Sequence, residues 1–127
     1  MISINGRKIT IPVDEKVVGI AGDNQVETRT FQLGRMYNDT DLSEFDFKLA
    51  MQNGVVSCAA DLSKTVNADN IILLWTITST HTSQSGLMRI QVQAYLDGEK
   101  KWFSNTDIVK VKSSIKIPDD PDESEDI

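Results

Sequence analysis

Apolar and polar residues alternate with a period of two in segment after segment, and this pattern constrains the fold more than any other feature. The clearest case is residues 87–96, where one face carries Met88, Ile90, Val92, Ala94 and Leu96 and the other carries Arg89, Gln91, Gln93 and Tyr95. Alternation of this kind is typical of a half-buried β-strand. Helical periodicity is nearly absent, so the chain is predicted to be all-β.

Three turn dipeptides join pairs of these segments. Asp97-Gly98 follows residues 87–96, Asn53-Gly54 follows residues 45–51, and Asn5-Gly6 follows residues 1–4. Dipeptides of this type tolerate positive φ and favour two-residue hairpin turns. We therefore expect three hairpins, whose second strands lie within residues 100–103, 55–62 and 7–11.

Further strand-length segments occur at residues 17–20, 26–33, 71–77 and 108–115. Residues 71–77 are apolar on both faces at first, which predicts a central strand covered on both sides. Any helix is expected to be one short turn within residues 78–85. Eight or nine short strands with regular turn signals favour an antiparallel β-sandwich of immunoglobulin-like type, with a closed barrel as the alternative.

Charge divides the chain into a neutral body and an acidic end. Of 19 acids, six lie in residues 118–127, which contain no base, so the rest of the chain has as many acids as its 13 Lys and Arg residues. We expect residues 1–12 to form an N-terminal hairpin, residues 13–117 a sandwich, and residues 118–127 a disordered tail. A neutral body with an acidic tail argues against binding to nucleic acid or to anionic membranes.

The single cysteine, Cys58, excludes an internal disulfide, and the N-terminus lacks the basic and apolar regions of a signal peptide. The longest apolar run, residues 71–75, is too short for a membrane-spanning helix. The chain is therefore expected to be made in the cytoplasm.

Residues suited to catalysis are scarce. His81 lies in a polar run of Ser and Thr residues and is interpreted as an exposed loop histidine, while Cys58 is interpreted as a small buried residue of a strand. One His and one Cys cannot build a zinc site, and no glycine-rich phosphate loop is present. We expect the chain to bind no cofactor and to have no catalytic activity. An enzyme based on His81 is the least favoured hypothesis.

Two groups of residues are candidates for interaction. Ile2, Ile4, Ile9 and Ile11 exceed what an isolated hairpin can bury, so they are expected to pack on the sandwich or on a neighbouring subunit. Trp75 is expected in the core. Trp102, beside two lysines, is expected at a surface, where with Tyr37 and His81 it would form a ligand-binding surface.

A family resemblance rests on the order of several short matches between residues 20 and 115. They are Gly22-Asp23-Asn24-Gln25-Val26-Glu27-Thr28-Arg29-Thr30-Phe31, Asp46-Phe47-Lys48-Leu49, Trp75-Thr76-Ile77-Thr78, Thr80-His81-Thr82, Gly86, Ile90-Gln91-Val92-Gln93-Ala94, Lys101-Trp102-Phe103-Ser104 and Val111-Lys112-Ser113-Ser114. In this order they resemble the immunoglobulin-like domain at the N-terminus of upper baseplate proteins, and of related tail and head appendage proteins, of phages of Gram-positive bacteria.

The resemblance implies a non-enzymatic virion protein that acts through contacts with other virion proteins. A homo-oligomer is a further expectation. Upper baseplate proteins continue into a long helical linker, whereas this sequence continues into an acidic tail, so a tail, collar, head-fibre or capsid-decoration subunit stays open. The alternative is a module that binds a cell-wall glycan or host receptor through Tyr37, His81 and Trp102.

Overall fold

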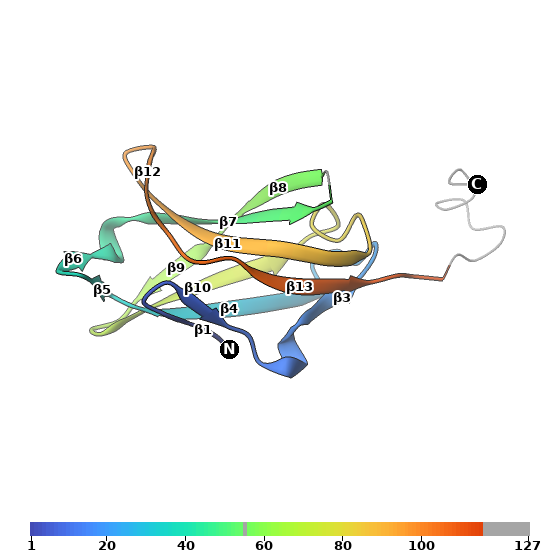
Figure 1. The fold of residues 1–127 in the computed structure, drawn as a ribbon, viewed down its shortest axis with the longest axis horizontal. Helices are drawn as coiled ribbons and strands as arrows, with labels where there is room; N and C mark the ends of the chain where they lie inside the picture. The colour runs from blue at the N-terminus through green and yellow to red at the C-terminus, as the bar shows by residue number, and fades with distance from the viewer. Residues whose placement is uncertain (55, 116–127) are drawn as a thin grey trace.

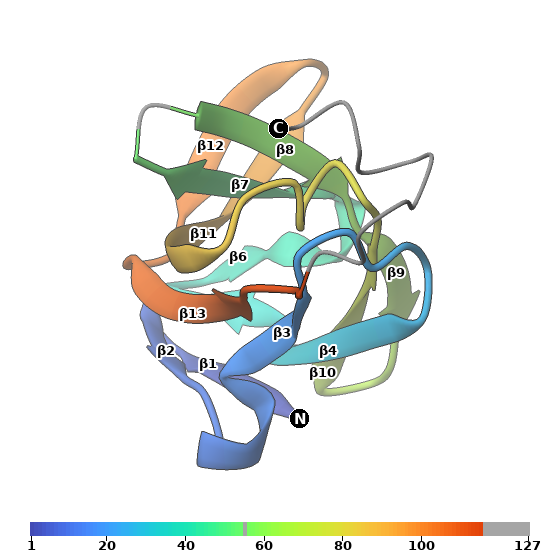
Figure 2. The ribbon, with the colours of Figure 1, turned by 90° about the vertical axis from the view of Figure 1, so that its right-hand side faces the viewer.

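The computed structural model describes residues 1–54 and 56–115, and their regular secondary structure is almost entirely β-strand (Figure 1). The strands lie in two main sheets that pack as a sandwich, and Figure 2 shows the two layers end on. No ladder among the described residues joins one main sheet to the other, so the sandwich prediction is confirmed in preference to a closed barrel. None of the described residues form a helix able to cross a membrane.

The first sheet has the strand order β2-β1-β4-β10-β9. Its strands are β1 (Ile2–Asn5), β2 (Lys8–Thr10), β4 (Glu27–Gly34), β9 (Ser63–Val66) and β10 (Asn70–Ile77). All its pairings are antiparallel except that of β1 with β4, which is parallel.

The second sheet has the order β3-β13-β11-β7-β8, and β12 pairs with the far half of β11. Its strands are β3 (Val17–Ile20), β7 (Asp46–Asn53), β8 (Val56–Asp61), β11 (Gly86–Leu96), β12 (Glu99–Phe103) and β13 (Asp107–Lys112). The pairing of β3 with β13 is also parallel, so the sandwich is not antiparallel throughout. A separate ribbon pairs β5 (Met36–Tyr37) with β6 (Thr40–Asp41).

All three predicted hairpins form. They are the β1–β2, β7–β8 and β11–β12 pairs. At the last of these turns Asp97 and Gly98 have φ values of 54° and 80°, the left-handed pair that a two-residue hairpin turn requires.

The core is built from the inward faces of alternating strands. From β10, Ile71, Leu73, Trp75 and Ile77 are all at most 1% exposed. Leu74 on the other face is 37% exposed, so the prediction that this strand is covered on both sides is wrong. Among residues 1–54 and 56–115 no second layer packs on the outer face of this sheet, and the strand is central only in its hydrogen-bonding order.

The N-terminal hairpin belongs to the sandwich. β1 lies between β2 and β4, and Ile2, Ile4, Ile9 and Ile11 are between 0 and 7% exposed. Of the two places expected for these isoleucines, the protein's own core is the one observed, so none of the four is presented to a second subunit.

Each flank of the sandwich is closed by a segment that passes from one sheet to the other. After β2, the edge of the first sheet, the chain forms a short 3₁₀ turn (η1, Val13–Glu15) and becomes β3, the edge of the second. On the opposite flank β8 ends the second sheet, and after Leu62 the chain continues as β9, the edge of the first.

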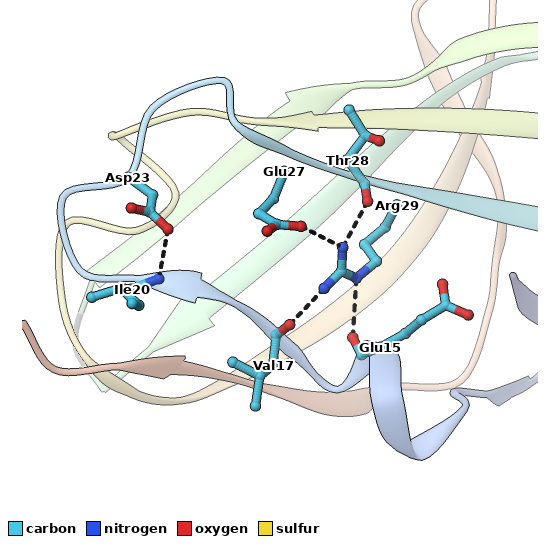
Figure 3. A network of polar contacts seen from close by, with 7 residues as sticks. All are labelled: Glu15, Val17, Ile20, Asp23, Glu27, Thr28 and Arg29. Atoms are coloured by element: carbon cyan, nitrogen blue, oxygen red, sulfur yellow. Dashed lines mark hydrogen bonds and ion pairs between the residues drawn. The ribbon is translucent and has the colours of Figure 1, made fainter.

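Arg29 of β4 holds the first of these crossings in place (Figure 3). Its guanidinium donates to the carbonyl oxygens of Glu15 at 3.1 Å and of Val17 at 2.6 Å, and it also meets the Glu27 carboxylate at 3.2 Å. The Arg29 side chain is 11% exposed, so its charge-assisted hydrogen bonds satisfy carbonyls that water reaches poorly. On the opposite flank Lys64 Nζ donates to the carbonyls of Ser43 and Phe45, each at 2.7 Å.

Two local features differ from the predictions. Residues 78–85 contain a single turn, closed by the Thr78 carbonyl and the His81 amide at 3.0 Å, whereas the 3₁₀ turns lie at η1 and at η2 (Leu42–Glu44). The short strand β9 was not predicted because its residues are all exposed and mostly polar. The predicted tail, residues 118–127, lies outside the described residues.

Candidate interaction site

Two of the three residues predicted to form a ligand-binding surface lie together. Tyr37 of β5 and Trp102 of β12 make an edge-to-face contact, with ring centroids 5.9 Å apart and an interplanar angle of 67°. The turn after β10, residues 78–85, contains His81 and lies at the end of the sandwich opposite the β5–β6 ribbon (Figure 1). The structure therefore does not bring His81 to the two aromatic rings.

Arg7 completes the cluster with Tyr37 and Trp102. Its guanidinium carbon lies 5.0 Å from the centroid of Tyr37 and 5.8 Å from that of Trp102, within the range of cation–π attraction. Arg7 Nε donates to the Tyr37 hydroxyl at 2.8 Å, and Nη1 donates to the carbonyl of Phe103 at 2.6 Å. The guanidinium is thus held in one orientation by contacts to two separate segments.

Sequence reasoning found the Asn5-Gly6 turn but missed Arg7, which follows directly. Its partners lie 30 and 96 residues further along the chain, and only the folded sandwich brings the three segments together. A basic residue after a hairpin turn has no local pattern that distinguishes it from any solvated side chain.

The β5–β6 ribbon positions Tyr37. Asn38 and Asp39 have φ values of 45° and 67°, so they form a tight two-residue turn between Tyr37 and Thr40. At the base of the ribbon the Arg35 guanidinium contacts the Asp41 carboxylate at 3.1 Å, and Asp41 also accepts from the amide of Ser43 at 2.9 Å. The hydrogen bond from Arg35, supported by that from Ser43, holds the pKa of Asp41 far below its ordinary value.

An open hollow of about 390 Å³ lies against this cluster. Its lining includes Arg7, Tyr37, Thr40, Phe45, Lys101 and Trp102, and contains no carboxylate. Lys101 is paired with Glu99 at 2.9 Å, whereas Arg7 has no acidic partner among the described residues. The hollow therefore presents an oriented positive charge beside aromatic and apolar surface.

Trp102 is 5% exposed, so the expectation that it lies at a surface is wrong. Arg7 and Tyr37 lie over its ring. Its indole Nε1 is buried without a hydrogen-bond partner among the described residues, an unusual state for a folded protein.

His81 is buried and not an exposed loop residue, which corrects the sequence-based interpretation. It is 9% exposed, and its Nδ1 accepts hydrogen bonds from Trp75 Nε1 and from the amide of Thr78, each at 3.1 Å. Burial lowers the pKa of His81. Because Nδ1 must be unprotonated to accept, the ring is neutral and anchors the turn after β10 to the core.

Cys58 is another reactive group within the described residues. It is half-buried on β8, and burial raises the pKa of its thiol, which disfavours the nucleophilic thiolate. Within residues 1–54 and 56–115, no three His, Cys, Asp or Glu side chains gather closely enough to hold a metal ion. The six acids of residues 118–127 lie outside the described residues.

No protein-family model and no curated protein matches the chain. Among solved structures, the chain is similar to one described as the N-terminal domain of phage TP901-1 ORF48, with a TM-score of 0.58 and 10% sequence identity. The likeness covers 87% of this chain and 95% of that one. At this identity the comparison shows a shared fold.

Proposed function

We propose that the chain is a structural subunit of a phage virion, in a baseplate, tail or head appendage, that acts through protein–protein contacts and not through catalysis. The observation that carries this proposal is the extent of the fold likeness. It covers 87% of this chain and 95% of the phage domain, so the two domains correspond over most of their length and not only in one hairpin. The family resemblance over residues 20 to 115 supports the same class of protein.

Arg7 and Tyr37, which cover the buried ring of Trp102, form the surface that we assign to a neighbouring virion protein. Arg, Tyr and Trp are the residues that most often dominate the binding energy of protein interfaces. Arg7 is held in place but lacks an acidic partner among the described residues, and the lining of the hollow beside it combines aromatic and apolar side chains with polar ones and Lys101. The complementary partner presents a carboxylate to Arg7 and an apolar side chain to the hollow.

The alternative, a glycan-binding or receptor-binding module, is less well supported. Glycan recognition by tryptophan needs an open ring face, whereas Trp102 is 5% exposed beneath Arg7 and Tyr37. The third predicted member of that surface, His81, is buried at the other end of the sandwich with its Nδ1 already bonded.

The location is tested by quantitative mass spectrometry of virions purified from the phage whose genome encodes the chain. A structural subunit is expected at a fixed number of copies per virion, and antibody labelling in the electron microscope would place it on the tail or the head. Detection of the chain only in the lysate fraction that is free of virions would contradict the proposal.

The contact surface is tested in the same virions with Arg7→Gln, for which the neighbouring exposed Lys8→Gln is the matched control. Loss of a central interface arginine is expected to reduce incorporation about tenfold, and the control is expected to leave it unchanged. Thermal melting of both purified variants shows whether they are folded. Wild-type incorporation of a folded Arg7→Gln variant would refute the assigned surface.

A further inference from the structure

A second surface, on the outer face of the second sheet, combines exposed aliphatic side chains with basic side chains. Leu87 of β11 lies opposite Lys110 of β13, Arg89 lies opposite Ile108, and Ile20 of β3 lies opposite Lys112. These six residues, on three strands that lie side by side in Figure 1, form what we call the β13 face.

The aliphatic members of the β13 face are unusually exposed for a sheet. Leu87 is 64% exposed, Ile108 is 46% exposed and Ile20 is 45% exposed. They lie on adjacent strands and not singly, so they form a patch of the kind that marks an interaction surface.

The charged members of the face all have the same sign. None of Arg89, Lys110 and Lys112 has an acidic partner among the described residues, and the face itself contains no Asp or Glu. A ligand that fits this face carries several carboxylates together with aliphatic side chains.

The chain contains one segment with that composition. Residues 117–127 hold six acids and no base and have an isoleucine at each end, Ile117 and Ile127. The segment begins five residues after Lys112, the last residue of β13. Such a short tether gives a ligand an effective local concentration on the order of millimolar, so even weak complementarity favours binding.

We propose that the β13 face is a peptide-binding surface and that the chain's own acidic segment, residues 117–127, occupies it. Carboxylates of the segment lie against Arg89, Lys110 and Lys112, and its isoleucines cover exposed aliphatic surface. Any other protein that uses this face then has to displace the segment. The inference does not depend on the virion role.

The test uses the chain ending at residue 115 and a fluorescein-labelled synthetic peptide of residues 116–127. The shortened chain keeps every buried core residue, since these lie between Ile2 and Val111, and its melting temperature verifies its fold. Fluorescence anisotropy is expected to show saturable binding of the peptide that weakens as salt is raised. The full chain is expected to bind the peptide at least about tenfold more weakly, because its own segment competes.

Two surface variants of the shortened chain distinguish specific binding at the β13 face from non-specific attraction of the acidic peptide to exposed lysines. Lys110→Gln with Lys112→Gln is expected to weaken binding about fivefold, and Leu87→Ser is expected to weaken it by a similar factor. The matched control, Lys8→Gln with Lys100→Gln, removes two exposed lysines from other strands and is expected to change nothing.

Three outcomes would overturn the proposal. The first is no saturable binding to the shortened chain, and the second is equal binding by the face variant and its control. The third is dimerisation of the shortened chain, measured by light scattering, that is abolished by Leu87→Ser without any peptide binding. That result would assign the face to a second copy of the chain.

Discussion

The guanidinium of Arg29 donates to the carbonyl oxygen of Val17 at 2.6 Å, and this bond joins a central strand of one sheet to the edge strand of the other. With the bond to Glu15 it fixes the path by which the chain crosses the flank of the sandwich. In addition to the pairing of β3 with β13, one largely buried side chain therefore helps to fix the position of this edge.

Arg29→Ala is therefore expected to lower the free energy of unfolding by about 2–3 kcal/mol, because it leaves poorly hydrated carbonyls without donors. Arg29→Lys is expected to recover only part of this loss, since an ammonium cannot reproduce the guanidinium fork. Urea denaturation measures both, with the exposed Arg89→Ala as the control, expected within about 0.5 kcal/mol of wild type. Equal stability of Arg29→Ala and the control would refute this role.

Deletion of residues 1–11 is expected to unfold the protein. The deletion removes β1 and β2, and with them the parallel neighbour of β4 and four buried isoleucines. Each such residue contributes about 2–5 kcal/mol by comparison with Ile→Ala substitutions, and a domain has only about 5–15 kcal/mol in total. Circular dichroism would show the loss of cooperative melting, whereas removal of residues 116–127 should preserve it. A cooperative transition in the N-terminal deletion would contradict the integral position of the hairpin.

The stability of the fold is expected to fall as the pH drops below about 6.5 because of His81. Burial lowers the pKa of the folded histidine below its ordinary value of 6.5. Between the two pKa values the unfolded chain binds a proton that the folded chain does not, so acidification favours unfolding. The loss begins near the unfolded pKa and stops only when the folded pKa is passed.

Urea titrations between pH 8 and pH 5 measure this slope, and His81→Asn is the informative variant. Asparagine keeps an acceptor near the position of Nδ1 but does not titrate in this range. The variant should show a flatter profile than wild type from pH 7 to pH 5. An identical slope in both proteins would assign the pH dependence to another group.

The Arg35–Asp41 pair is expected to order the β5–β6 ribbon and to have little effect on the rest of the fold. Because the pKa of Asp41 lies far below its ordinary value of 3.8, the carboxylate stays ionised at pH 4 and the pair persists there. Asp41→Asn should speed amide hydrogen exchange at Tyr37 and Thr40 and leave the melting temperature nearly unchanged. Unchanged exchange in the ribbon would show that the turn alone orders it.

The Cys58 thiol is expected to react slowly with iodoacetamide. Burial raises its pKa, and the thiolate is the reactive form. Mass spectrometry should show alkylation at least about tenfold slower in the folded protein than in urea. Similar rates in the two states would mean that this part of β8 opens readily.

Much of the fold follows from local pattern. The alternation in residues 87–96 and the Asp97-Gly98 turn predict β11, β12 and their hairpin, because these features depend on neighbours in sequence. The same reasoning failed at β9, where Ser63, Lys64 and Thr65 carry no apolar signal. Its place in the sheet is set by its pairing with β10 and by the Lys64 bonds to the Ser43 and Phe45 carbonyls.

The candidate site was predicted only in part for a related reason. Tyr37 and Trp102 were chosen as amphipathic aromatics, and they do meet, but nothing local reveals that Arg7 covers the ring of Trp102. His81 was misjudged because its polar neighbours suggest an exposed loop, while the group that buries it, Trp75, belongs to the strand before.

The two flank crossings also bear on how the protein avoids aggregation. Because each crossing divides a segment between two sheets, the edge strands β2, β3, β8 and β9 have only three, four, six and four residues. Short edges are poor templates for the open-ended strand addition that leads to amyloid. The protein is therefore expected to resist polymerising through its backbone when concentrated, and its specific contacts are left to side-chain surfaces.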